Sequence, residues 1–343
     1  MLTRQQKKTI TTVAWFTVPT ILIFLLVSVG LTLYTVQYIT HPKKNPSFAA
    51  TVKDYELLGI LITQSEESWN LKNRGGQATG WLLRASTGAP AIILSHSLGQ
   101  NRADLLSLGV GLQRAGYHVL LYDLRAQGTS GAEMVTYGDY ESEDILAAIE
   151  HLKTLKDTEG NLLVDQERFG LYGVSIGGYA SLVAASKEPA VKAVVVDAVY
   201  PDVKKMIKLR TKAMIGFNNS LIDSCLDMGM GLAYTNYATT SAIKSVRGFT
   251  ETKQLYILGK DAGDLLMTTS EVYGQALGSK ETVEVPHSRL NVLYKNDQDV
   301  YDPVVVDFFR RPDVLPPIPA SAPEVKTETE TKESSTADAN EKK

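Results

Sequence analysis

A serine flanked by glycines is the strongest chemical signal in the sequence. Gly173 to Gly178 read GVSIGG, which places Ser175 two positions from a glycine on each side. A predicted strand, Arg168 to Val174, precedes the motif, and the residues YASL of a predicted helix follow it. A strand that turns sharply into a helix needs Gly173 and Gly177, because side chains there would collide while the serine is held exposed. The motif alone arises by chance in roughly one chain in ten of this composition, so this strand-and-helix context supports a nucleophilic Ser175.

A serine nucleophile requires a base, usually a histidine, which a carboxylate orients. His287 follows a predicted strand, Thr282 to Val285, and it stands where the chain order serine, acid, histidine places the base. We therefore predict that His287 is the general base. The other four histidines are less suited to this role. His41 borders the charge-free N-terminal segment, His118 lies in a predicted strand and His151 in a predicted helix. His96 ends a strand far upstream of Ser175.

The orienting acid is predicted in the loop GKDAGD, which follows the predicted strand Gln254 to Leu258. Asp261 is nearer the strand end and is favoured, because this carboxylate must be held rigidly against the imidazole. Asp264 remains the alternative. Asp197, which ends an earlier predicted strand, is a third candidate, but capping of the turn before Tyr200 is its favoured role.

An oxyanion formed at the attacked carbonyl needs two N–H donors. One comes from the residue after the nucleophile, Ile176, and the other from a loop after an earlier strand. The sequence HSLG follows the predicted strand Ala91 to Leu94, and the amide of Leu98 is the expected second donor. His96 is interpreted as a residue that structures this loop rather than as a second base.

Short apolar runs alternate with amphipathic stretches between about Phe48 and Arg311. This alternation predicts an α/β fold with a mostly parallel sheet and helices on both faces. One helix is predicted where apolar residues recur at the spacing of a single buried helical face. A second, final helix is predicted over Tyr301 to Phe309, with Pro303 in its first turn. The predicted strands are 91–94, 118–122, 168–174, 191–196, 254–258 and 282–285, and the helical face is Ile145, Ala148, Ile149 and Leu152.

The 32 residues from Thr9 to Thr40 carry no charge. About 20 apolar residues span a bilayer as a helix, whereas the apolar part of a cleaved signal peptide has about 7 to 15. A retained single-pass signal anchor in the cell membrane is therefore favoured over cleavage, and Pro19 either kinks the helix or marks its start. Three basic residues before the segment against two after it favour an N-terminus inside the cell and an extracytoplasmic catalytic domain.

The whole chain divides into three parts. Residues 1–45 form a cytoplasmic stub and transmembrane anchor, 48–311 a folded domain with a cap insertion at about 201–250, and 312–343 a Pro-rich, charged tail that is predicted to be disordered. A formal charge of −3 argues against a dedicated nucleic-acid binder. The single cysteine, Cys225, cannot build a multi-cysteine metal site. We predict that the protein requires no metal or organic cofactor. The sequence does not indicate the oligomeric state.

These motifs together resemble the α/β-hydrolase superfamily. The resemblance covers about residues 55–310 and rests on HSLGQNR, YDLRAQGTSG, GVSIGG and PHS in that order. Within the superfamily the chain is similar to membrane-anchored bacterial esterase-like or serine-aminopeptidase-like proteins. The resemblance implies an eight-stranded sheet with a helical cap, a triad of Ser175, Asp261 and His287, and acyl-enzyme chemistry on esters, thioesters or amides. The chain departs from the usual pattern at Ser97, Ala126, Gln127 and the acid loop.

The sequence therefore predicts a membrane-anchored serine hydrolase that cleaves carboxylic ester or thioester bonds of a small acyl substrate through an acyl-enzyme on Ser175. A serine peptidase or amidase acting on short peptides shares the same triad and is the first alternative. A catalytically degenerate hydrolase fold used as a binding module is the second.

Overall fold

The structure is a computed structural model, and the residues that it describes are 3–46, 51–57, 63–73, 75–217, 219–233 and 237–318. Most of the predicted disordered tail, from residue 319 onward, lies outside this range, as do residues 47–50 at the predicted start of the folded domain.

An eight-stranded sheet forms the centre of the domain, as the resemblance implies. The strand order is β1-β2-β4-β3-β5-β6-β7-β8. β1 pairs antiparallel with β2 and β2 with β4, while all the other neighbours are parallel. The six predicted strands are confirmed, and the unpredicted hairpin of β1 and β2 adds one edge. The strands are β1 (Gln64–Asn70), β2 (Gln77–Leu83), β3 (Ala89–Ser95), β4 (His118–Tyr122), β5 (Val164–Val174), β6 (Val191–Asp197), β7 (Lys253–Gly259) and β8 (Lys280–Val285).

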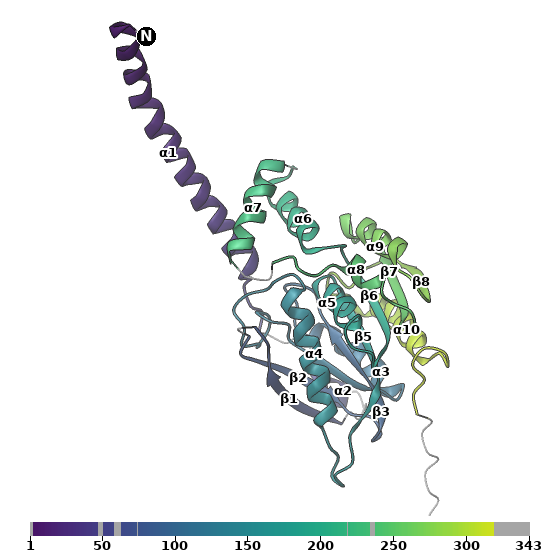
Figure 1. The fold of residues 1–343 in the computed structure, drawn as a ribbon. Helices are drawn as coiled ribbons and strands as arrows, with labels where there is room; N and C mark the ends of the chain where they lie inside the picture. Colours follow the sequence, from purple (N-terminus) through teal and green to yellow (C-terminus); the bar gives the residue numbers. More distant parts are fainter. Residues whose placement is uncertain are drawn as a thin grey trace, which may run out of the picture.

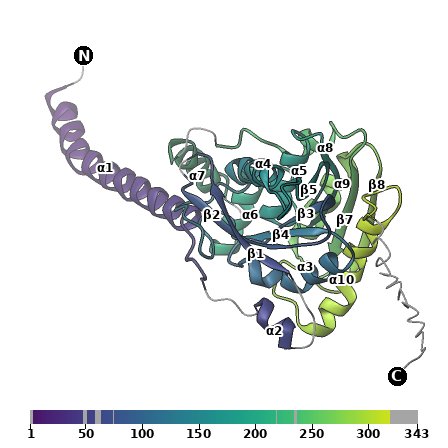
Figure 2. The ribbon, with the colours of Figure 1, turned by 90° about the horizontal axis from the view of Figure 1, so that it is seen from below.

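Helices cover both faces of the sheet, as Figure 2 shows for α4 and α5 on one side and α3 and α10 on the other. Alternate residues of a strand point to opposite faces, so Ile93 joins one apolar layer and Ile92 the other. Both layers are buried, which explains the continuous apolar runs of the central strands. These helices are α3 (Leu106–Arg114), α4 (Asp139–Thr154), α5 (Ile176–Ala185) and α10 (Lys295–Arg310), and the short segments α2 (Val52–Leu57) and η1 (Arg102–Leu105) accompany them.

The predicted buried face of α4 is confirmed, because its four apolar residues are fully buried. The prediction for the last helix is wrong at its start. α10 begins at Lys295, so Pro303 lies in the helix interior rather than in the first turn. Pro303 and Asp299 are both exposed, and water can therefore bind the Asp299 carbonyl that the proline leaves without a donor.

Three helices follow β6 and precede β7, in the region where the cap insertion is predicted. α6 (Val203–Ile215) and α7 (Ser220–Ala233) form a hairpin that stands away from the sheet, and α8 (Ala242–Val246) returns the chain to it (Figure 1). α9 (Asp264–Gln275) follows β7 and lies beside α8. The hairpin lies toward the carboxyl ends of the parallel strands, which is the edge where α/β sheets bind their ligands.

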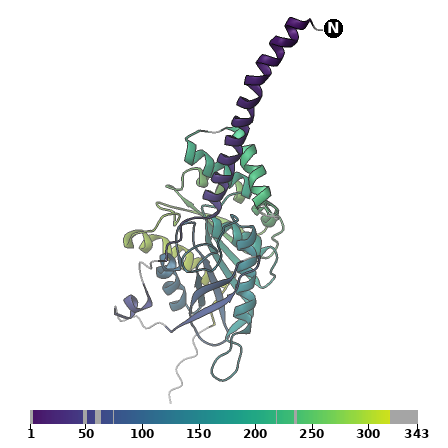
Figure 3. The same cartoon turned by 90° about the vertical axis from the view of Figure 1, so that its left-hand side faces the viewer.

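The N-terminal segment is one long helix, α1 (Arg4–Thr40), which projects from the domain (Figures 1 and 3). It begins after the N-cap residue Thr3, so Pro19 lies inside the helix and does not mark its start. Only its C-terminal end is buried, where the Tyr137 hydroxyl donates to the Ile39 carbonyl over 2.8 Å. By length and composition α1 is suited to cross a membrane.

Candidate active site

Ser175 lies in the sharp turn between β5 and α5. Its backbone adopts φ 51° and ψ −110°, a region that a non-glycine residue occupies only when its surroundings hold it there. A Cβ on Gly173 would lie 2.3 Å from the Gly177 carbonyl oxygen, and one on Gly177 would lie 2.4 Å from the Ser95 oxygen. Larger residues at either glycine would therefore push the backbone apart, and the two glycines allow the turn that presents Ser175.

A pocket of about 380 Å³ opens above Ser175. Its volume falls within the range of small-molecule sites. One wall is the cap helix α6, and the others are the loops that follow β3, β7 and β8. The lining residues are Ser97, Leu98, Ser175, Met206, Leu209, Arg210, Ala213, Ala262, Asp264, Leu265, Leu290 and Asn291.

Two backbone amides beside Ser175 are available to an acceptor. The backbone amides on either side of Leu98 already form hydrogen bonds: Ser97 N–H donates to Gln100 Oε1 and Gly99 N–H donates to Gln127 Oε1, each over 3.0 Å. In the part of the chain that the structure describes, the amides of Leu98 and Ile176 make no hydrogen bond. These are the two donors expected for an oxyanion, and Leu98 lines the same pocket as Ser175.

His96 is fully buried and holds the loop after β3. Leu124 N–H donates to its Nε2 over 3.1 Å, so the proton resides on Nδ1, which donates to the Ser97 carbonyl over 2.7 Å. Burial lowers the pKa of His96 and favours this neutral form. With both nitrogens engaged, His96 has none free to accept a proton from Ser175.

The structure brings His287 and Asp261 together across the ends of β7 and β8. Nδ1 of His287 lies 3.1 Å from Asp261 Oδ2, and Ser288 N–H donates to Asp261 Oδ1 over 2.7 Å. Asp264, the alternative acid, instead begins α9 and pairs with Lys212 over 2.8 Å. Of the two candidates, only Asp261 is placed to orient the imidazole.

The structure does not join His287 to Ser175. His287 Nε2 lies 3.8 Å from Asp297 Oδ1, and its side chain is 50% exposed. Among the described residues, no side chain forms a hydrogen bond with the Ser175 hydroxyl. Sequence reasoning missed Asp297, because it placed the start of the last helix at Tyr301. The helix begins six residues earlier, at Lys295, and this additional part brings Asp297 beside the imidazole.

Asp197 has a role different from the predicted turn cap. Its carboxylate accepts bonds from Ser288 Oγ over 2.9 Å, Arg289 N–H over 2.8 Å and Tyr301 hydroxyl over 2.8 Å. Its backbone carbonyl accepts the Ser175 N–H over 2.9 Å. Asp197 therefore joins the segment of the nucleophile to the loop that carries His287. The signal available in the sequence was an acid at the carboxyl end of a buried strand.

The buried position of Asp197 leads to a pH-dependence prediction. Burial raises the pKa of Asp197 from 3.8 to about 6, so the folded protein retains this proton to a higher pH than the unfolded chain. The contribution of Asp197 to stability therefore falls as pH rises from about 4 to 6. Relative to Asp197→Asn, the unfolding free energy of the wild type should decrease by about 3 kcal/mol over this interval. Urea titrations in detergent at several pH values measure the unfolding free energies of the wild type and Asp197→Asn. A difference between the two that does not vary with pH would contradict the prediction.

No group of three or more His, Cys, Asp or Glu side chains suited to hold a metal ion occurs within the described ranges. The groups that the structure places near the carboxyl ends of the strands include the Ser175 hydroxyl, two amides and the Asp261–His287 pair. This set is suited to attack on a carbonyl carbon and to stabilisation of the resulting oxyanion.

Comparisons with known proteins agree with the fold. Residues 90–220 match the family described as alpha/beta hydrolase fold. A stretch of 121 residues is 34% identical to the thiohydrolase apmlB of Arthrinium phaeospermum and covers 34% of this chain and 37% of that protein. Another of 94 residues is 30% identical to the uncharacterized protein YqkD of Bacillus subtilis and covers 27% and 28%. Each alignment spans about a third of the relative's own length.

Solved structures extend the similarity of fold beyond the aligned sequence. The esterase Pf2001 of Pyrococcus furiosus superposes with a TM-score of 0.58 at 18% identity, over 79% of this chain and 98% of that chain. The α/β hydrolase GrgF of Penicillium sp. sh18 gives 0.53 at 17% identity, over 73% and 98%. The family match at 90–220, the eight-stranded sheet and the sharp turn at Ser175 together show that this chain has the α/β-hydrolase fold.

Proposed function

We propose that this protein is a membrane-anchored serine hydrolase of esterase type, which cleaves carboxylic ester or thioester bonds through an acyl-enzyme on Ser175. The observation that carries the proposal is the strained turn that presents Ser175 to a pocket beside two unengaged amides. Similarity to a thiohydrolase and to an esterase favours ester and thioester substrates over amides.

In the proposed mechanism, Ser175 Oγ attacks the carbonyl carbon while His287 takes its proton. Asp261 holds the imidazole through Nδ1 and stabilises the imidazolium. The amides of Leu98 and Ile176 donate to the oxyanion. The tetrahedral intermediate then expels the alcohol or thiol, which His287 protonates, and a water molecule activated by His287 releases the acid from Ser175.

This mechanism requires the imidazole of His287 to turn from Asp297 toward Ser175. The contact with Asp297, at 3.8 Å, is longer than a hydrogen bond, and half of the imidazole side chain is exposed. Catalytic hydrogen bonds are often long in a free enzyme and shorten when substrate binds. We infer that substrate in the Ser175 pocket accompanies this rotation, while Asp261 keeps its bond to Nδ1.

Labelling with a fluorophosphonate tests the nucleophile. The reagent forms a covalent bond only with an activated serine, so the full-length wild type in detergent should label and Ser175→Ala should not. Ser186→Ala is the matched control, because Ser186 is an exposed serine at the other end of α5, and this variant should label like the wild type. Equal labelling of the wild type and Ser175→Ala would show that another residue is the nucleophile.

The placement of His287 beside Asp297 favours a second candidate function, a hydrolase fold that binds acyl ligands without turnover. In that case Ser175 has no base and the wild type should resist the fluorophosphonate. The labelling experiment therefore separates the two functions directly.

We further propose that α1 anchors the protein as a single-pass helix, with the N-terminus inside and the catalytic domain extracytoplasmic. The length and apolar composition of α1 support the anchor, and the excess of basic residues before it supports the orientation. The corresponding division is an anchor at 1–45 and a hydrolase domain that starts at 48. The predicted boundary of the tail at 312 is wrong, because Val314 and Leu315 pack in the core of the domain, and the charged tail follows them.

A further inference from the structure

The cap hairpin of α6 and α7 exposes a group of large apolar side chains. Leu221 is 70% exposed and Leu232 is 79% exposed. Such a concentration on one projecting element is typical of an interaction surface rather than of scattered surface residues. Met214, Phe217 and Leu221 form the apolar tip, where α6 ends and α7 begins, and Met228 and Leu232 lie nearer the base of the hairpin.

The hairpin packs against the proposed membrane helix. A Cβ on Gly229 of α7 would lie 2.9 Å from Thr32 Cγ2 and 3.0 Å from Val36 Cγ2 of α1, so the glycine permits close contact between the two helices. Figures 1 and 3 both show the tip of the hairpin pointing the same way as α1, toward its N-terminus. The packing therefore places the apolar tip beside α1.

Helix dimensions place this tip at the depth of the bilayer surface. The charge-free part of α1 from Thr9 to Thr32 is about 35 Å long at 1.5 Å per residue, and the hydrocarbon core is about 30 Å thick. A core that begins at Thr9 therefore ends about 5 Å before Thr32, the residue that contacts Gly229. α7 begins nine residues before Gly229, so the tip extends up to about 13 Å further toward the membrane.

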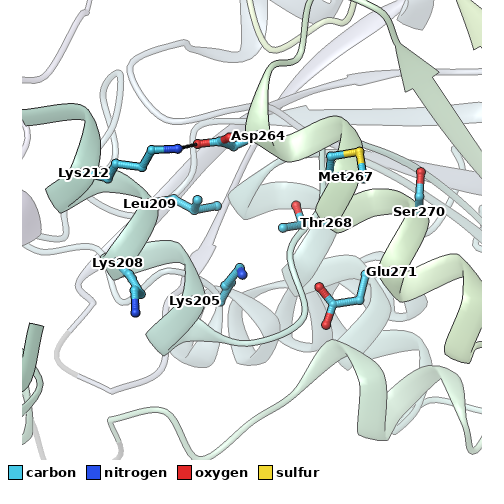
Figure 4. A pocket seen from close by; sticks show the side chains of 9 residues that line it. All are labelled: Lys205, Lys208, Leu209, Lys212, Asp264, Met267, Thr268, Ser270 and Glu271. Atoms are coloured by element: carbon cyan, nitrogen blue, oxygen red, sulfur yellow. Dashed lines mark hydrogen bonds and ion pairs between the residues drawn. The ribbon is translucent and has the colours of Figure 1, made fainter. Parts of the chain in front are cut away.

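Lysines of α6 lie below the apolar tip. Lys205, Lys208 and Lys212 line a cavity of about 570 Å³ between α6 and α9, together with Asp264 and Glu271 (Figure 4). Lys212 pairs with Asp264 and Lys208 with Asp223, whereas Lys205 forms no ion pair with any residue that the structure describes. Lysines with long apolar stems are suited to contact lipid phosphates at this level.

We propose that the α6–α7 hairpin docks into the surface of the bilayer beside α1, and that the Ser175 pocket takes its substrate from the membrane. The pocket shares α6 with the hairpin, through Met206, Leu209 and Arg210. The substrate class is an amphiphilic acyl ester dissolved in the lipid. This inference rests on the membrane anchor and the Ser175 hydrolase of the proposed function.

A fluorescence experiment tests the docking without catalysis. The full-length Cys225→Ser protein, with Leu221→Cys carrying an environment-sensitive dye, is reconstituted into vesicles of phosphatidylcholine and phosphatidylglycerol. The emission should shift to shorter wavelength and be quenched by nitroxide-labelled lipids. Leu162→Cys is the matched control, because Leu162 is an exposed leucine in the loop before β5, away from the cap, and its dye should remain in water. A water-exposed dye at position 221 would overturn the docking.

Hydrolysis of two esters tests the source of the substrate. The ratio of the rate on a long-chain monoacylglycerol in vesicles to that on a soluble short-chain ester should fall about tenfold for each of Phe217→Ser and Leu221→Ser, because each loses its apolar contact with lipid. Leu277→Ser, at an exposed leucine away from the cap hairpin, should keep the wild-type ratio. If the two hairpin variants keep the wild-type ratio while cleavage of the soluble ester still requires Ser175, this inference alone is overturned. If cleavage of the soluble ester persists in Ser175→Ala, the proposed function is overturned.

Discussion

Alanine at Ser175, or at His287, is expected to lower kcat for hydrolysis of a soluble ester by about a millionfold, the scale for loss of a nucleophile or base that act as one unit. Without Ser175 Oγ no acyl-enzyme forms, and without His287 the hydroxyl keeps its proton. Steady-state assays of the full-length protein in detergent measure both losses, with Ser186→Ala as the control for the substitution of a serine on α5.

The double variant Ser175→Ala/His287→Ala shows whether the two residues work together. Its rate should equal that of either single variant, because removing one member already disables the unit. The measurement is informative here because Nε2 of His287 faces Asp297 rather than Ser175. A small loss in His287→Ala, followed by a further large loss in the double variant, would show that His287 is not the base.

Replacement of Asp261 by asparagine is expected to lower kcat about ten-thousandfold. The Asp261 carboxylate accepts the proton on Nδ1, so Nε2 stays free to act as the base. An amide side chain can donate as well as accept, which allows the tautomer with the proton on Nε2, and it also removes the charge that stabilises the imidazolium.

Asp264→Asn is the comparison for Asp261→Asn, because it removes the same charge from the same loop. Asp264 pairs with Lys212 and does not contact His287, so the loss for Asp261→Asn should exceed that for Asp264→Asn by at least about a hundredfold. Equal losses, or a larger loss at Asp264, would assign the orienting role to Asp264.

Much of the fold was predictable because its signals are local. The central strands are apolar on both faces, and the spacing of Ile145, Ala148, Ile149 and Leu152 indicated a buried helical face. The β1–β2 hairpin escaped prediction because β1 reads QSEESWN, a largely polar edge strand with only one buried residue. An edge strand is held mainly by its backbone bonds to β2, which sequence patterns do not reveal.

The sharp turn at Ser175 was predictable from the sequence, because glycines two positions either side of the serine mark it. Gly173 faces Gly177 within the turn, whereas Gly177 also lies against Ser95 of β3. Tertiary packing selects the acid that meets His287, because Asp261 and Asp264 are only three positions apart in the chain, yet Asp261 faces His287 and Asp264 faces Lys212. It likewise turned Asp197 toward Ser288 and Tyr301 and packed Gly229 against α1. Backbone conformation depends on near neighbours, whereas the partners of a carboxylate or an imidazole depend on how distant segments pack.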